Sequence, residues 1–317
     1  MDRQLRPTRL TLRQLAYFDA VARHRHFGRA AEACNVSQPA LSVQIQELEK
    51  ELGVILVERG RGSVALTPRG TYIAQRARRI LGEVQDLVDS AALAEAVGTI
   101  RLGVIPTIAP YLMPAIFGAL GHGGSTAQVQ VRETQTQRLL QELEDGSLDL
   151  LLTALPVTGS GLESQPLFHD RFFLAVPASS DIGPRIESIA AVGSHRLLLL
   201  EEGHCLRDQA LSVCSAADKE MLASLGATSL ATLIELVAVG MGVTLLPELC
   251  LPSVNGDRRI RVVPFRGRAP FRTVGLVWRK SSARKAAFRQ LGEIVMEARG
   301  PQQTTQAMSS SRTTSRS

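Results

Sequence analysis

Two cysteines in the segment EEGHCLRDQALSVCSAADK, residues 201–219, are the side chains of this sequence best suited to redox chemistry. Cys205 and Cys214 lie nine positions apart, and the first is surrounded by charged or titratable neighbours: His204, Arg207 and Asp208. The pair could form a structural disulfide, bind a metal, fill a core or act as reactive thiols. Because a thiolate rather than a thiol attacks an oxidant, the last role needs surroundings that lower the pKa of one cysteine.

Composition argues against the first two roles. The chain has 317 residues, of which 44% are hydrophobic, so it can form two or three domains. Its start is too polar for a signal peptide and its apolar runs are too short to span a bilayer, which predicts a cytoplasmic protein with no membrane partner. Four cysteines in a reducing compartment do not make a disulfide framework, and none has metal-site spacing. We therefore expect no metal and no other cofactor.

The elements around Cys205 favour a reactive thiol. HRLLLLEEG predicts a strand that ends at Gly203, so Cys205 would begin the following helix. A helix N-terminus stabilises an anion such as a thiolate. Arg207 and His204 could add positive charge or a hydrogen bond, whereas Asp208 opposes this unless it orients one of those bases.

A helix over 206–214 would keep the two cysteines apart. Nine residues at about 1.5 Å each separate them by roughly 13 Å, whereas a disulfide needs Cα atoms within about 7 Å. Closing the bond would therefore require the helix to unwind, which would convert oxidation into refolding of this segment.

The N-terminal segment predicts a DNA-reading unit. Apolar residues recur with helical spacing in TLRQLAYFDAVARH, and a short helix, a turn at Asn35 and a longer helix follow. Ser37 is the expected N-cap of the longer helix, with Pro39 in its first turn. This pattern is typical of a helix-turn-helix, whose second helix enters the DNA major groove. Its open face would present four residues: Ser37, Gln38, Pro39 and Ser42.

Two strands, VILVE and VALT, follow this helix and predict a β-hairpin, so that the unit becomes a winged helix. Arg59 and Arg61 would lie at the tip of the wing, where a guanidinium can reach phosphates or a minor groove. The first 70 residues carry 11 Lys and Arg against 7 Asp and Glu, a basic balance that suits a polyanion.

A long helix is predicted after Thr67, its expected N-cap. Its apolar residues recur at steps of four and three, the heptad pattern of a two-stranded coiled coil: Ile73, Ala77, Ile80, Val84, Leu87 and Ala91. A single helix packed on its own domain would have a similar pattern. The length of the repeat favours a dimer that presents two reading helices to two DNA half-sites.

The segment FGRAAEACNVSQPALSVQIQELEKELGVILVERGRGSVALTPRG resembles the DNA-binding domain of LysR-type transcriptional regulators. This resemblance implies an all-α winged-helix domain at 1–66, a linker and dimerisation helix at 67–97, and an α/β regulatory domain at 98–299. The regulatory domain would have two lobes like a periplasmic binding protein. Residues 300–317 are polar and are expected to form a disordered tail.

Within this family, the GHCLRDQ…C segment is similar to that of the peroxide-sensing branch. That resemblance implies that Cys205 is oxidised by hydrogen peroxide and that Cys214 then condenses with it to a disulfide. Six further residues match a peroxide pocket between the lobes: Thr107, Thr136, His204, Arg207, Asp208 and Arg272. The implied protein is not an enzyme. It is a regulator of antioxidant genes that binds promoter DNA as a dimer or tetramer, with RNA polymerase as a further partner.

Two rival functions are consistent with parts of the sequence. An ordinary member of the family would bind a small organic effector between the lobes, and the GHCLRDQ…C segment argues against it. A thiol peroxidase would leave the N-terminal reading unit unexplained.

Overall fold

The computed structural model describes residues 9–59, 64–91, 99–122, 128–159, 161–189, 195–213 and 222–300. Four of the expectations fall outside these ranges: Arg61 at the tip of the wing, Cys214, the linker residues 92–97 and the tail 301–317.

Three helices form the N-terminal domain, as predicted. Helix α1 (Leu12–His24) and helix α2 (Phe27–Ala33) precede α3 (Gln38–Leu52). The Ser37 hydroxyl accepts a hydrogen bond from the backbone N–H of Ala40 at 3.4 Å, which confirms the predicted N-cap. At the other end of α3, Gly53 takes the left-handed conformation (φ 67°) that terminates the helix.

The predicted wing is an antiparallel pair of strands, β1 (Val57–Arg59) and β2 (Val64–Leu66). Glu49 of α3 accepts hydrogen bonds from the backbone N–H groups of Leu56 and Val57, at 2.7 and 3.1 Å. These bonds hold the wing against α3.

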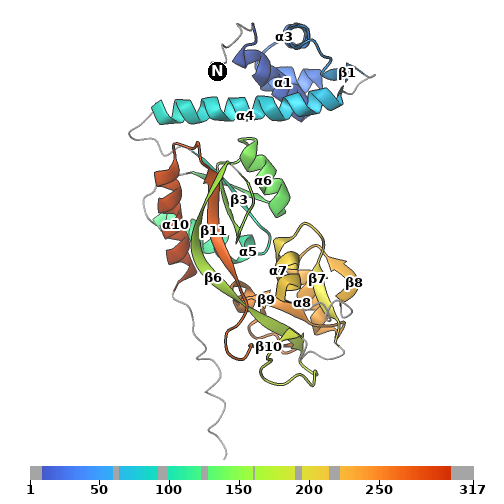
Figure 1. Cartoon of the computed structure of the whole chain (residues 1–317), viewed down its shortest axis with the longest axis vertical. Coiled ribbons are helices and arrows are strands. Elements are labelled where there is room, and N and C mark those ends of the chain that lie inside the picture. Colours follow the sequence, from blue (N-terminus) through green and yellow to red (C-terminus); the bar gives the residue numbers. More distant parts are fainter. Residues whose placement is uncertain are drawn as a thin grey trace, which may run out of the picture.

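Helix α4 (Pro68–Ala91) is the predicted linker helix, and the Thr67 hydroxyl caps it by accepting from Gly70 N–H at 2.8 Å. The predicted heptad face divides into two parts. Its first part packs inside the N-terminal domain, where Ala77 is buried. Its second part is open, because Ile80 is 39% exposed and Leu87 is 67% exposed. Figure 1 shows α4 lying between the N-terminal domain and the rest of the chain.

A seven-stranded sheet organises the C-terminal domain. Its order is β10-β6-β11-β5-β3-β4, with β9 also paired to β6. The strands are β3 (Ile100–Val104), β4 (Val129–Glu133), β5 (Leu150–Leu155), β6 (Leu162–Pro177), β9 (Thr244–Pro247), β10 (Ile260–Val263) and β11 (Phe271–Arg279). Strands β3, β4 and β5 pair in parallel, whereas β11 runs antiparallel to both of its neighbours.

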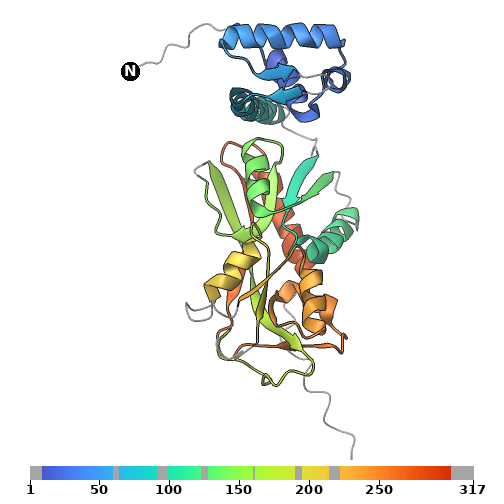
Figure 2. The ribbon, with the colours of Figure 1, turned by 90° about the vertical axis from the view of Figure 1, so that its right-hand side faces the viewer.

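The domain has two lobes that share strand β6. This strand pairs with β11 over residues 162–171 and with β9 and β10 over 172–177. The first lobe adds α5 (Ala109–His122), α6 (Thr136–Glu144) and α10 (Lys285–Arg299). The second adds β7 (Leu197–Leu200), α7 (Cys205–Val213), β8 (Leu222–Ala227), α8 (Leu230–Ala238), the short η3 (Glu248–Cys250) and α9 (Leu251–Val254). Each lobe has its own hydrophobic core, and Figure 2 shows them joined by extended strands.

The expected two-lobed α/β domain behind a winged helix is therefore confirmed. Across the described part of the chain, none of the helices combines the length and the apolar character that a membrane crossing requires. The same residues contain no cluster of three or more His, Cys, Asp or Glu side chains arranged to hold a metal ion.

Candidate functional site

Cys205 lies where the two lobes meet. Strand β7 ends at Leu200, and Cys205 is the first residue of α7 in the second lobe, as the sequence predicts. The Cys205 side chain nevertheless packs against the core of the first lobe, while its neighbour Leu206 is buried in the core of the second. A helix N-terminus therefore presents this thiol to the opposite lobe.

The turn before Cys205 depends on glycine at position 203. Gly203 has a φ of 91°, and a Cβ there would lie 2.7 Å from the amide oxygen of Gln135. Gln135 comes from the first lobe, directly before α6, and its amide N–H group donates to the backbone oxygen of Glu202 at 3.4 Å. The glycine thus allows the two lobes to approach closely beside the thiol.

A small, tight pocket lies at this contact, with about 160 Å³ of empty space that includes its opening to solvent. Its lining comes from both lobes: Ile105, Pro106, Thr107, Gln135, Thr136, His204 and Cys205. The Thr136 hydroxyl is buried and has no hydrogen-bond partner within the protein. Because buried polar groups are nearly always satisfied, this hydroxyl indicates a small polar molecule as the natural occupant of the pocket.

Arg272 orients the second hydroxyl of the pocket. Its Nη1 donates to Thr107 Oγ1 at 2.7 Å and its Nη2 to the Thr107 carbonyl at 3.0 Å. Its Nε donates to Asp170 at 2.9 Å, and both side chains of this ion pair are fully buried. Since Thr107 Oγ1 accepts from the guanidinium, its own proton is left to be donated to an occupant of the pocket.

The three other predicted pocket residues, His204, Arg207 and Asp208, differ from one another in burial and in hydrogen bonding. Burial lowers the pKa of His204, so its imidazole is neutral at pH 7 and offers hydrogen bonds rather than positive charge. Arg207 Nη1 donates to the carbonyl of Leu200 at 3.0 Å and so ties α7 to the end of β7. Asp208 is exposed in the first turn of α7. Of the six predicted pocket residues, Thr107, Thr136 and His204 line the small pocket, while Arg207, Asp208 and Arg272 are absent from its described lining.

The other described cysteines lie in less reactive surroundings. Cys250 is fully buried in the second lobe, and burial raises the pKa of its thiol to about 12. Burial also raises the pKa of Cys34, which packs beside the core of the N-terminal domain. A raised pKa keeps a thiol protonated and poorly nucleophilic, which leaves Cys205 as the thiol placed for chemistry in the described structure.

The predicted DNA-facing residues lie together at the start of α3. Ser37, Gln38 and Pro39 are exposed, and Ser42 is partly exposed one turn later. Arg59 ends strand β1 of the adjacent wing, next to the undescribed tip. The same small domain thus presents an open helix end and a hairpin, the two elements with which a winged helix reads DNA.

Sequence reasoning missed two residues of the pocket's surroundings, Gln135 and Asp170. Gln135 lines the pocket and contacts the Gly203 turn. Asp170 holds Arg272 from within a mostly apolar strand, FHDRFFLAV, and an isolated acid in such a strand was the signal that could have identified it.

Comparison with known families agrees with this architecture. Residues 12–71 match the bacterial regulatory helix-turn-helix protein, LysR family, and residues 94–300 match the LysR substrate binding domain. A probable hydrogen peroxide-inducible genes activator from Streptomyces viridosporus is 42% identical over 91% of this chain and 94% of its own length. The DNA-binding transcriptional dual regulator OxyR of Escherichia coli K12 is 38% identical over 90% and 95%.

Solved structures give the same result for the fold. A full-length OxyR variant from Pseudomonas aeruginosa has a TM-score of 0.76 and 35% identity, over 90% of this chain and 97% of that one. A hydrogen peroxide-bound cysteine-to-serine mutant of Corynebacterium glutamicum OxyR has a TM-score of 0.63 and 32% identity, over 92% and 94%. These relatives are gene regulators rather than enzymes. With a family match that covers most of its length, this chain belongs to the LysR family of transcriptional regulators.

Proposed function

We propose that this chain is a peroxide-responsive transcriptional regulator in which hydrogen peroxide oxidises Cys205. The observation that carries the proposal is the pocket that joins the Cys205 thiol, at a helix N-terminus, to the Thr107 and Thr136 hydroxyls. Its relatives include proteins named hydrogen peroxide-inducible genes activators, which supports the same signal.

The chemistry requires a thiolate and two hydrogen-bonding groups. The Cys205 thiolate attacks one oxygen of hydrogen peroxide, the O–O bond breaks, and hydroxide leaves and is protonated to water. The hydroxyls of Thr107 and Thr136 hold the peroxide oxygens, with Thr107 fixed as a donor by Arg272. The product is a sulfenic acid on Cys205. The Cys214 thiol then attacks its sulfur, and a second water leaves as the disulfide forms.

The size of the pocket favours peroxide over an organic effector. Pockets for small organic ligands enclose about 300–1,000 Å³, whereas the empty space in this one, including the part open to solvent, is only about 160 Å³. A more open hollow, with about 780 Å³ of empty space on the same measure, lies elsewhere, beside Ile189, Phe265 and Phe271. Cys205, Thr107 and Thr136 do not line it. An organic effector there would leave the cysteine pocket unused.

The output of the switch is DNA binding. The residues proposed to meet promoter DNA are Ser37, Gln38, Pro39, Ser42, Arg59 and Arg61, presented twice by a dimer formed through the open part of α4. We further propose pairing of dimers into tetramers, contact with RNA polymerase at the promoter and a cytoplasmic location. We propose the domain boundaries that the sequence suggested: residues 1–66 read DNA, residues 67–97 link and dimerise, and residues 98–299 sense peroxide.

Helix α7 converts oxidation into a change of shape. It extends from Cys205 to Val213, so Cys214 follows its last helical residue. Its length of about 13 Å exceeds the roughly 7 Å that a disulfide allows between Cα atoms, so the bond requires α7 to unwind. Leu206 and Ala210 would then leave the core of the second lobe.

Intact-mass spectrometry after one equivalent of hydrogen peroxide tests the proposal, with hydrogen exchange of residues 205–213 measured on the same samples. The wild-type protein should lose two mass units, recover them with a thiol reductant and exchange faster along α7 when oxidised. Cys214→Ser should gain one oxygen at Cys205 instead, and Cys205→Ser should change neither mass nor exchange. If peroxide leaves Cys205 unmodified in the wild-type protein while a small organic acid changes its DNA binding, the chain is an effector-binding regulator.

A further inference from the structure

Helix α6 joins the thiol pocket to the linker helix. Its first residue, Thr136, lines the pocket, and the turn that follows its last residue, Glu144, contacts α4. Nine helical residues at about 1.5 Å each place these ends about 13 Å apart. Figure 1 shows α6 at the top of the first lobe, next to α4.

At the pocket end, α6 touches the segment that oxidation must rearrange. Gln135, the residue before the helix, bonds the Glu202 carbonyl and packs against Gly203 so closely that a Cβ there would overlap its side chain. A change in the path of the chain before Cys205 therefore displaces the start of α6.

At the other end, the turn after α6 packs directly on α4. A Cβ on Gly82 of α4 would lie 3.2 Å from the Gly146 Cα, and one on Gly146 would lie 3.1 Å from the Gly82 Cα. Beside this contact, Arg78 Nη1 lies 3.9 Å from the Asp145 carboxylate. Backbone thus meets backbone, which leaves little room for relative movement.

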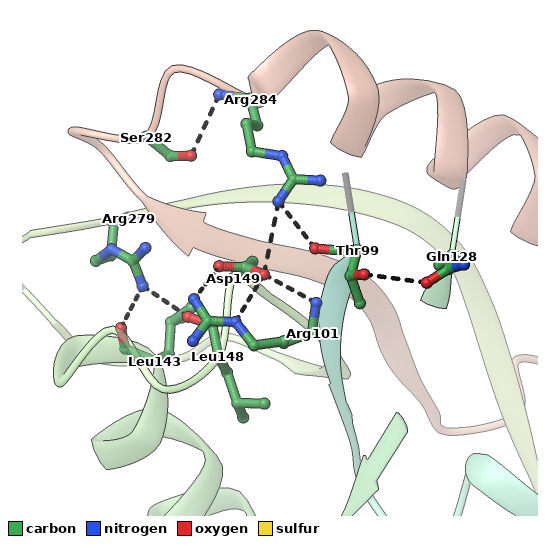
Figure 3. Close-up of polar contacts among 9 residues, drawn as sticks. All are labelled: Thr99, Arg101, Gln128, Leu143, Leu148, Asp149, Arg279, Ser282 and Arg284. Atoms are coloured by element: carbon green, nitrogen blue, oxygen red, sulfur yellow. Dashed lines mark hydrogen bonds and ion pairs between the residues drawn. The ribbon is translucent and has the colours of Figure 1, made fainter. Parts of the chain in front are cut away.

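The turn after α6 is fixed to the first lobe. Arg279 Nη1 donates to the carbonyls of Leu143 and Leu148, both at 2.7 Å. Asp149, the next residue, accepts from Arg101 N–H at 2.8 Å and from Arg101 Nη2 at 2.6 Å (Figure 3). The buried side chains of Leu139 and Leu143 also fix the helix to the core. Helix and turn therefore move as one body.

Helix α4 is fixed in turn to the N-terminal domain. Arg78 Nε donates to Asp19 of α1 at 2.6 Å, and Ala74 and Ala77 are buried in that domain's core. Arg78 therefore contacts Asp19 of the N-terminal domain, the DNA-reading domain, and lies close to Asp145 of the C-terminal domain, the sensing domain.

We infer that α6 and the Asp145–Gly146 turn transmit the state of the Cys205 pocket to α4 and, through the Arg78–Asp19 contact, to the DNA-reading domain of the same subunit. This inference rests on the proposed peroxide response, and it assigns to Gly82 and Gly146 the role of a contact between domains. Arg78 and Asp145 are positioning residues of that contact and take no part in the redox chemistry.

Gly82→Ala tests the inference in the full-length protein. The added Cβ would lie 3.2 Å from the Gly146 Cα, so the 145–146 turn must shift by a few tenths of an ångström, while alanine favours the helical conformation of α4. Gly121→Ala in α5 is the matched control, because a Cβ there meets no atom within 4 Å. Asp145→Ala is a second variant that removes the carboxylate facing Arg78. Intact mass follows oxidation of Cys205, and hydrogen exchange of residues 78–88 follows α4.

In the wild-type protein and in Gly121→Ala, oxidation should change exchange in α4 by about fivefold or more, the lower bound of typical coupling between sites. In Gly82→Ala and Asp145→Ala, Cys205 should be oxidised at the wild-type rate while the exchange of α4 stays within twofold. The inference is wrong if oxidation leaves α4 exchange unchanged in the wild-type protein, or if both variants keep the wild-type change. If peroxide modifies Cys205 in none of the four proteins, the result instead overturns the proposed function.

Discussion

The Thr136 hydroxyl is the most informative single group at the pocket. It is buried without a protein partner, which costs about 1–3 kcal/mol unless a bound molecule satisfies it. A side chain selected for stability alone would be valine, which has the same shape and no polar atom. The hydroxyl therefore indicates selection for contact with the occupant of the pocket.

Thr136→Val should separate this role from folding. The free energy of unfolding should rise or stay within about 1 kcal/mol, because no protein hydrogen bond is lost. Oxidation of Cys205 by peroxide should slow about tenfold or more, because one hydrogen bond to the reacting oxygens is missing. Rapid-mixing mass spectrometry measures the rate, and Thr136→Ser should restore it. Equal rates for the valine variant and the wild-type protein would remove Thr136 from the mechanism.

His204 should make stability depend on pH. Burial lowers its pKa in the native state below the unfolded value of about 6.5. As the pH falls below about 6.5, the unfolded chain binds a proton that the native state resists, so the free energy of unfolding decreases. Above that pH the contribution is complete. Urea unfolding at pH 5.5 and pH 7.5 should show a smaller difference for His204→Gln than for the wild-type protein. An unchanged difference would mean that other groups set this slope.

Among the elements, α3 and the wing should contribute differently to DNA recognition. Gln38 is exposed at the first position of α3, where an amide can bind a base edge. Gln38→Ala should cost about 1–3 kcal/mol at its base and relax discrimination there. Arg61→Ala should weaken binding to all sequences and reduce the slope of log K against log salt by about one. Fluorescence anisotropy with matched and mismatched operators distinguishes the two effects, and unchanged affinity in both variants would reject the assignment.

Most individual elements could be predicted from the sequence because their signals are local. Ser37, Gly53 and Thr67 mark helix ends through side-chain or backbone preferences that need no tertiary contact. Gln135 and Asp170 escaped prediction because their roles arise only when the lobes meet. The heptad pattern of α4 was ambiguous for a related reason: burial of Ala77 in its own domain and burial in a dimer would require the same spacing.

For the whole molecule, the open part of α4 should determine assembly. Leu87→Glu places a charge on a residue that is 67% exposed here, so the subunit should fold normally and dimerise poorly. Gln85→Glu adds the same charge to an exposed neighbour off the heptad face. Light scattering should give a lower mass for the Leu87 variant alone. A wild-type mass for that variant would locate the assembly contacts elsewhere.

The two-lobed plan followed from the resemblance to the LysR family, but the length of β6 did not. Only its last part, the apolar run FFLAVP, has the sequence pattern of a strand, whereas the whole strand includes 16 residues. Its first ten residues, LESQPLFHDR, are mostly polar and contain a proline, so nothing local indicates a strand. Pairing with β11 along nine positions makes this part a strand.

Because both lobes share strand β6, the strand also affects how cooperatively the two-lobed domain unfolds on heating. Neither lobe can lose its part of the sheet without releasing the strand that completes the other. The two lobes should therefore unfold in one transition despite having separate cores. For the sensing domain, calorimetry should give a van't Hoff enthalpy equal to the calorimetric one, where two independent lobes would give a ratio of about one half. An unfolded lobe would then rarely be exposed beside a folded one, which protects the two-lobed domain from proteolysis.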